Sequence, residues 1–195
     1  MSRWPGWRRL FGGEPLPDGF TGQLAAEERV LAVAELAGGS HLVVTSYGVW
    51  LPEGRRIGWH LVTKATWDGG ALALVEAEEC GADDRAGECG AEVRSADDRA
   101  DDRADDVVLL RDLPPLRLAL TQPGAVPEVV HKRVTGSIRF RHHRELPGGG
   151  AWFVQRSVPG RDGLQLQVRA DPGTDTAAVR RVATEVAGKL REVRG

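Results

Sequence analysis

Cysteine and long apolar runs are scarce in this sequence of 195 residues. The two cysteines, Cys80 and Cys89, are too few for a disulfide framework, which favours a reducing compartment. No apolar run approaches the roughly 20 residues that a transmembrane helix needs. The first residues place arginines among tryptophans and lack the apolar stretch of a secretory signal. We therefore expect a cytoplasmic protein without a transmembrane segment.

The motifs of the common enzyme classes are missing as well. The sequence has no glycine-rich dinucleotide loop, no phosphate-binding P-loop and no nucleophile elbow. Cys80 and Cys89 have no second Cys or His pair that would complete a zinc site. We expect no cofactor, no metal and no catalytic residue. An enzyme whose site is assembled only in the fold is the alternative.

The net charge is −2, but the charged residues are unevenly distributed along the chain. Residues 80–106 hold ten Asp or Glu and four Arg, a net of −6, so the rest of the chain is about +4. The unit ADDR repeats there with a period of four, which would align like charges along a helix. We expect a disordered acidic loop inserted between two strands, with cation or partner binding as the alternative.

The first 26 residues predict a loosely ordered arm, because Gly and Pro interrupt any regular element. Trp4, Trp7, Arg8 and Arg9 could contact a membrane surface or a partner, since arginine attracts anionic headgroups and tryptophan favours the interface. The alternative is that these aromatic side chains pack on the protein's own surface.

The segment HLVVTSYGVWLP, residues 41–52, is apolar on both faces and predicts a central strand. Ile57, Trp59, Leu61 and Thr63 alternate and predict a second strand. The residues DGG at 68–70 indicate a hairpin that leads into a third strand, ALALVEAEE.

Beyond the acidic segment, VVLLRDLPPLRLAL predicts a return to the sheet. A helix should follow from Val126, with Pro127 in its first turn and Val130, Val134 and Ile138 on one side. Three strands (SIRFRHHREL, AWFVQRSVPG and GLQLQVRAD) and a C-terminal amphipathic helix complete the predicted order. Glu185 and Lys189 should form an exposed pair on that helix, and Thr174 or Asp175 can cap it. The acidic residues of DPGTD, Asp171 and Asp175, should cap the helix, with a site of paired carboxylates as the alternative.

The stretches VVTSYGVWLP, RRIGWHLVTKATWDGGAL and LPPLRLALTQPGAVPEVVHKRVTGSI resemble an uncharacterised actinobacterial protein family with a pleckstrin-homology-like (PH-like) barrel. The similarity covers about residues 27–178 and implies lipid or protein binding. The first hairpin loop, LAGGSH, has no Lys or Arg, unlike the phosphoinositide-binding members of the PH class.

The predicted fold is α+β. A PH-like antiparallel β-barrel with a helix should occupy residues 27–138, and a three-stranded antiparallel sheet with the C-terminal amphipathic helix should form an extension, residues 139–195, packed on the barrel.

Arg139, Arg141 and His143 would share one face of a strand, with Trp152 or Phe153 nearby as a stacking platform. This pattern predicts an anion patch, and a solvated sheet face is the alternative. The acidic loop could fold back on this patch and block nucleic acid. His142 and His143 would point to opposite faces, so they would not share a metal.

The favoured function is a non-enzymatic interaction or scaffold module with an unidentified protein partner. A peripheral module with weak contact to anionic lipid is one alternative. Nucleic acid is a less favoured partner.

Overall fold

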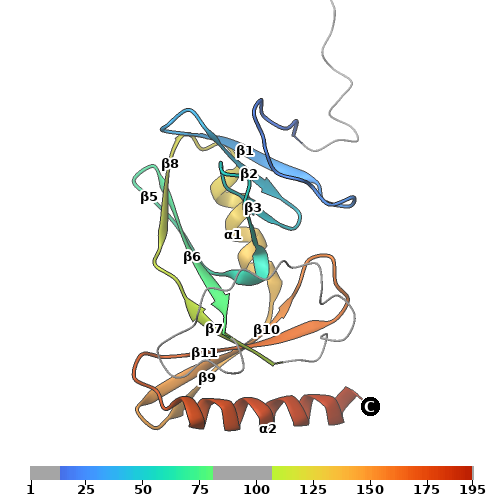
Figure 1. The fold of residues 1–195 in the computed structure, drawn as a ribbon, viewed down its shortest axis with the longest axis vertical. Coiled ribbons are helices and arrows are strands. Elements are labelled where there is room, and N and C mark those ends of the chain that lie inside the picture. The colour runs from blue at the N-terminus through green and yellow to red at the C-terminus, as the bar shows by residue number, and fades with distance from the viewer. Residues whose placement is uncertain (1–13, 81–106, 195) are drawn as a thin grey trace, which may run out of the picture.

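The computed structural model describes residues 14–80 and 107–194, with side chains to residue 189. In these residues, eleven strands form one mixed, mostly antiparallel sheet, and two α-helices pack on it (Figure 1). The strands are β1 (Val30–Leu36), β2 (His41–Thr45), β3 (Gly48–Trp50), β4 (Arg56–Gly58), β5 (Val62–Asp68), β6 (Ala71–Glu79), β7 (Val107–Asp112), β8 (Leu116–Gln122), β9 (Ile138–Leu146), β10 (Gly149–Ser157) and β11 (Leu164–Ala170). The helices are a 3-10 turn, η1 (Trp59–Leu61), α1 (Val126–Ser137) and α2 (Thr176–Arg194).

The sheet runs in the order β4-β3-β2-β1-β8-β6-β7-β11-β10-β9, and β5 also pairs with β6. The long strand β6 joins two parts of this sheet. Its first residues, 71–74, pair with β8, and its last residues, 77–79, pair with β7. The β7–β11 pair is parallel, whereas the other pairs are antiparallel.

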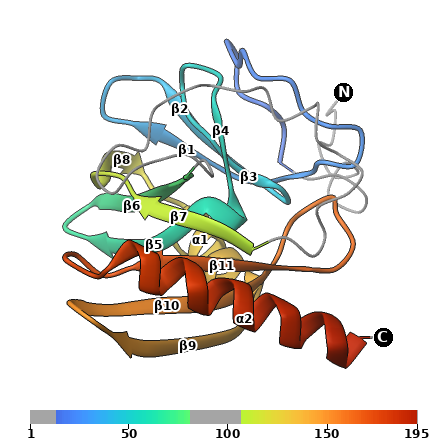
Figure 2. The same cartoon turned by 60° about the horizontal axis from the view of Figure 1, so that its bottom comes forward.

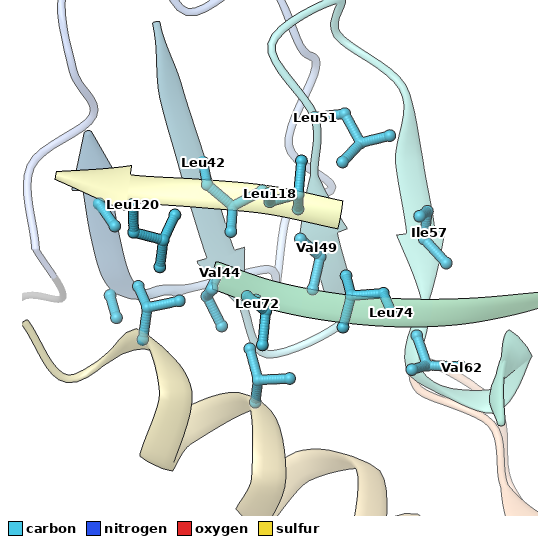
Figure 3. Close-up of a cluster of buried hydrophobic side chains, with 14 of the residues drawn as sticks. Leu42, Val44, Val49, Leu51, Ile57, Val62, Leu72, Leu74, Leu118 and Leu120 are labelled. Carbon is cyan, nitrogen blue, oxygen red and sulfur yellow. The ribbon is translucent and has the colours of Figure 1, made fainter. Parts of the chain in front are cut away.

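The larger core lies between the N-terminal part of the sheet and α1, which contacts β1, β2, β5 and η1. Figure 3 shows leucine and valine side chains from several strands converging above this helix. Val126 and Val130 of α1 are fully buried, and Val134 is nearly so, as the sequence spacing predicts. Pro127 lies in the first turn, as predicted. Ile138, in contrast, follows the end of the helix and begins β9.

A second, smaller core lies between α2 and the C-terminal strands. Phe153 and Val168 of the sheet pack with Val179 and Val182 of α2. Figure 2 shows α2 crossing the face of this part of the sheet. The predicted amphipathic helix is therefore confirmed, and Lys189 Nζ donates to Glu185 Oε1 at 2.7 Å on its exposed side.

The predicted closed barrel is wrong, because the sheet stays open, with β4 and β9 at opposite ends of its strand order. The chain leaves the three-residue strand β4 and turns inward at η1, where Trp59 is 1% exposed. Helix α1 then covers the apolar face that a barrel would enclose. The three C-terminal strands are antiparallel to one another, as predicted, but β11 joins the same sheet through β7.

Two predicted strands are also interrupted. The stretch 41–52 folds back on itself as the β2–β3 pair, because the Thr45 hydroxyl accepts hydrogen bonds from the amides of Tyr47 (3.2 Å) and Gly48 (3.1 Å) and so caps a tight turn. The predicted strand from Ile57 to Thr63 is broken by η1, where the Trp59 indole donates to Thr45 O at 3.0 Å. The DGG hairpin between β5 and β6 is confirmed.

Residues 14–26 contain no helix or strand, yet they contact the sheet. Phe20 meets the Trp50 ring edge-on, at 5.6 Å between centroids, and Leu24 packs in the same small cluster. The Val33 amide donates to Glu14 Oε2 at 2.8 Å. Trp4, Trp7, Arg8 and Arg9, together with the acidic segment 81–106, lie outside the described residues.

Candidate functional site

A basic and aromatic group of side chains lies where β9 and β10 pair. Trp152 of β10 stands directly opposite His143 of β9, and the two ring centroids are 4.8 Å apart. The Cζ atom of Arg141 lies 4.1 Å from the centroid of the Trp152 ring. We call Arg141, His143, Trp152 and Asp171 the tryptophan cluster. It forms because residues two apart on β9 share a face with their cross-strand neighbours on β10.

Asp171 fixes the imidazole of this cluster. Its Oδ2 lies 2.7 Å from His143 Nε2, and both side chains are about one-third exposed. The prediction that the acidic residues of DPGTD cap the C-terminal helix is correct for Asp175, whose Oδ1 accepts the Ala177 amide at 2.9 Å. It is wrong for Asp171, because this residue lies five positions before α2, and its carboxylate turns to β9 instead.

Arg139 does not join the tryptophan cluster. A register irregularity between β9 and β10 leaves it without a directly opposed residue. Its Nε donates to Ser157 Oγ at 3.3 Å. Ser157 alternates with Trp152 along β10 and therefore belongs to the other face. Of the three predicted patch residues, the structure brings Arg141 and His143 together and directs Arg139 elsewhere.

The other face of β9 carries an exposed aromatic side chain. Phe140 is 54% exposed and stacks on His142, with 6.3 Å between the ring centroids and 25° between the planes. His142 and His143 thus point to opposite faces, as their adjacent positions predict. Phe153, the second predicted platform, lies in the core beneath α2 and cannot stack on a ligand.

The face of β10 and β11 that carries Trp152 is buried at its other end, where it holds residues that the sequence did not single out. Arg156 is 3% exposed, and its Nη1 donates to the carbonyls of Trp59 (3.0 Å) and Val62 (2.9 Å). Gln167 Nε2 donates to His60 O at 2.9 Å. These bonds tie β10 and β11 to η1. They escaped prediction because alternation along a strand does not show which element covers its polar side.

Charge and burial shift two pKa values at this junction. Burial, with the positive charge of Arg169 nearby, lowers the pKa of Arg156 to about 10, so it stays cationic at pH 7. Burial, with the positive charges of Arg161, Arg156 and Arg56, lowers the pKa of His60 to about 4. His60 is therefore neutral at pH 7, and its buried Nδ1 has no hydrogen-bond partner among the described residues.

A buried carboxylate in the N-terminal part is fully bonded. Glu28 Oε1 accepts the Thr45 hydroxyl (2.5 Å) and the Trp50 indole (2.8 Å). Its Oε2 accepts the Ala25 amide (3.1 Å) and Arg56 Nη1 (2.5 Å). With four donors and no exposed side-chain surface, this group holds the fold together rather than meeting a ligand.

The tryptophan cluster is suited to recognition of an anion. Within the described residues Arg141 contacts Trp152, forms no ion pair and is exposed, so its guanidinium donors are accessible to solvent. An arginine held against an indole has already lost part of its side-chain entropy and keeps its donors available to a carboxylate. Among the residues that the structure describes, no three His, Cys, Asp or Glu side chains lie close enough together to bind a metal ion.

Comparison of the chain with family models, curated proteins and solved structures finds no match. The similarity to the PH-like actinobacterial family thus stays a prediction. In the described part of the chain, neither helix has the length and apolar character to cross a bilayer.

Proposed function

We propose that this protein is a non-enzymatic interaction module that binds an acidic segment of a partner protein through the tryptophan cluster. The observation that carries the proposal is the guanidinium of Arg141, held 4.1 Å from the Trp152 ring centroid with no carboxylate paired to it in the described residues. A carboxylate is the natural ligand for such a group, because guanidinium donors match its two oxygens.

The size of the cluster favours a carboxylate over nucleic acid or a lipid surface. Nucleic-acid binding draws on several cationic contacts along the phosphate backbone. On β9, other side chains separate Arg139, Arg141 and Arg144 from one another, and Glu145 follows Arg144 directly. Asp171 adds a second negative charge beside His143. A small patch with its own acidic border supports binding of a short segment more than binding of an extended polyanion.

The His143–Asp171 pair supports a positioning role in this proposal. A nucleophilic enzyme would need a hydroxyl or thiol next to the imidazole. The nearby Thr174 hydroxyl instead donates to Gly150 O at 2.8 Å and accepts the Gly150 amide at 2.9 Å. Because that hydroxyl is engaged on both sides, we assign the pair to holding the His143 ring against Trp152.

The test measures binding of a fluorescent peptide of alternating glutamate and valine to the full chain at low salt. Arg141→Ala should weaken binding about tenfold, since loss of a charge-assisted contact costs about 1.5 kcal/mol or more. The matched control is Arg117→Ala, which removes an exposed arginine from β8 and should leave the affinity unchanged.

Anionic vesicles and a single-stranded oligonucleotide serve as competing probes. Tighter binding of either one than of the peptide, lost in Arg141→Ala, would assign the cluster to that ligand and contradict the proposal. Equal weakening by the two arginine variants would show only a general charge effect, and would also contradict it.

A further inference from the structure

We infer that the acidic segment binds as an additional β-strand along β9, and that it alternates acidic with apolar residues. This inference rests on the proposed function, since it specifies how the same partner would sit. It draws on three features of β9: an unpaired backbone edge, two chemically different faces, and a net positive charge.

β9 has an unpaired backbone edge in the described sheet. β9 is nine residues long, lies at the end of the strand order and pairs only with β10 in the described sheet. Figure 2 shows it at the border of the sheet, beyond β10. An edge strand presents a row of backbone N–H and C=O groups that another extended chain can pair with.

The two other strands without a second neighbour offer less. β4, at the opposite end of the sheet, has only three residues. β5 has seven residues and packs against α1. β9, which α1 also contacts, has nine residues and is the longest of the three edges in the described sheet.

The side chains of β9 specify what the added strand would carry. One face presents Arg141 and His143 beside Trp152, and the other presents Phe140, which is 54% exposed. Residues of an added strand alternate between the same two faces. Acidic residues on the first face would meet Arg141, and apolar residues on the second would cover Phe140.

Charge argues against a second copy of this chain as the occupant. From Arg139 to Leu146 the strand carries three arginines, one glutamate and two histidines. Two such strands side by side would bring together two segments of net positive charge, which opposes pairing. An acidic strand reverses the sign of this interaction.

The experiment compares two forms of the glutamate–valine peptide, about seven residues long, against the full chain. One form has ordinary amides, and the other carries N-methyl groups on alternate amides along the edge that would face β9. The methylated form keeps its charge and side chains but cannot donate to a neighbouring strand. Strand addition predicts that methylation weakens binding about tenfold or more.

The apolar contact is tested with Phe140→Ser, which should weaken binding several-fold. Trp67→Ser is the matched control, because Trp67 is 41% exposed on β5 and distant in the strand order. Both side chains are exposed, so both variants should fold. Equal affinity of Phe140→Ser and the unaltered chain would overturn the alternating pattern.

The outcomes distinguish strand addition along β9 from the proposed binding of an acidic segment. If the methylated and ordinary peptides bind equally, strand addition fails while acidic-segment binding stands. If neither binds, both fail. A peptide-free dimer in sedimentation that Phe140→Ser converts to a monomer would assign β9 to a second copy and overturn the inference.

Discussion

A single buried arginine fastens the C-terminal strands to the rest of the molecule. Arg156 reaches from β10 to the carbonyls of Trp59 and Val62 and lies 3.4 Å from the Ser137 hydroxyl at the end of α1. Its charge has no carboxylate bonded to it among the described side chains. The guanidinium is stabilised by the carbonyl dipoles of Trp59 in η1 and of Val62 at the start of β5.

Replacing this arginine with an apolar side chain should therefore destabilise the fold. Arg156→Met would remove the guanidinium that donates to the carbonyls of Trp59 and Val62, leaving Trp59 O with only the Val62 amide, at a loss of about 2–4 kcal/mol. Urea unfolding measures the change. Arg139→Met, an exposed arginine on the neighbouring strand, should change stability by less than about 0.5 kcal/mol. A stability of Arg156→Met equal to or above that of the unaltered chain would show that the buried cation is dispensable.

At the scale of elements, the turn between β2 and β3 depends on a glycine. A Cβ added at Gly48 would lie 2.2 Å from Ile57 O in the paired strand β4. That distance leaves no room for a methyl group without separating β3 from β4. Gly38, in the loop after β1, has open space around the same position.

The pair Gly48→Ala and Gly38→Ala tests this close approach. Gly48→Ala should reduce the free energy of unfolding by about 1–3 kcal/mol, because the strands must shift to admit the methyl group. Gly38→Ala should be nearly neutral. Thermal unfolding followed by circular dichroism reports both, and similar melting temperatures for the two variants would rule out a steric role for Gly48.

The elements that the sequence predicted correctly are those that the periodicity of their own residues specifies. Alternation from Leu164 to Arg169 predicts β11, and the valine spacing predicts α1 and α2. That alternation does not show what covers the polar side of β11, where Gln165 and Gln167 are buried and Gln167 bonds to the His60 carbonyl of η1. The β2–β3 turn and η1 depend on contacts of Thr45 and Trp59 with distant residues, which periodicity does not contain.

The candidate site was predictable only in part. Alternation correctly places Arg141 and His143 on one face and His142 on the other. It fails at Arg139, because a register irregularity is a property of two strands paired together and not of either strand alone. Asp171 joins the cluster through a loop, and no spacing rule links it to His143 across 28 positions.

At the scale of the whole molecule, two apolar cores meet at a polar junction. The core beneath α1 and the core beneath α2 contain separate sets of buried side chains. Between them, Arg156 donates to the backbone carbonyls of Trp59 and Val62, and Gln167 donates to the carbonyl of His60, which belongs to the same junction. Figure 1 shows the two parts one above the other, with α1 in the upper part and α2 across the bottom.

The junction should make stability depend on pH through His60. Its pKa is about 4 in the folded chain against 6.5 in the unfolded chain, because burial and the charges of Arg161, Arg156 and Arg56 disfavour the imidazolium. Between these values the unfolded chain binds the proton more readily, so stability is lost as pH falls from about 6.5 toward 4. The full loss from this group is roughly 3 kcal/mol.

Comparison with His60→Gln isolates this contribution from that of the carboxylates, which titrate in both proteins. Urea unfolding at several pH values from 7 to 4 should show the unaltered chain losing up to about 3 kcal/mol more than the variant. Below pH 4 the two curves should run parallel, since His60 is then protonated in both states. Curves that are already parallel between pH 6.5 and 4 would mean that His60 ionises in the folded chain, and that the junction between the two cores admits water.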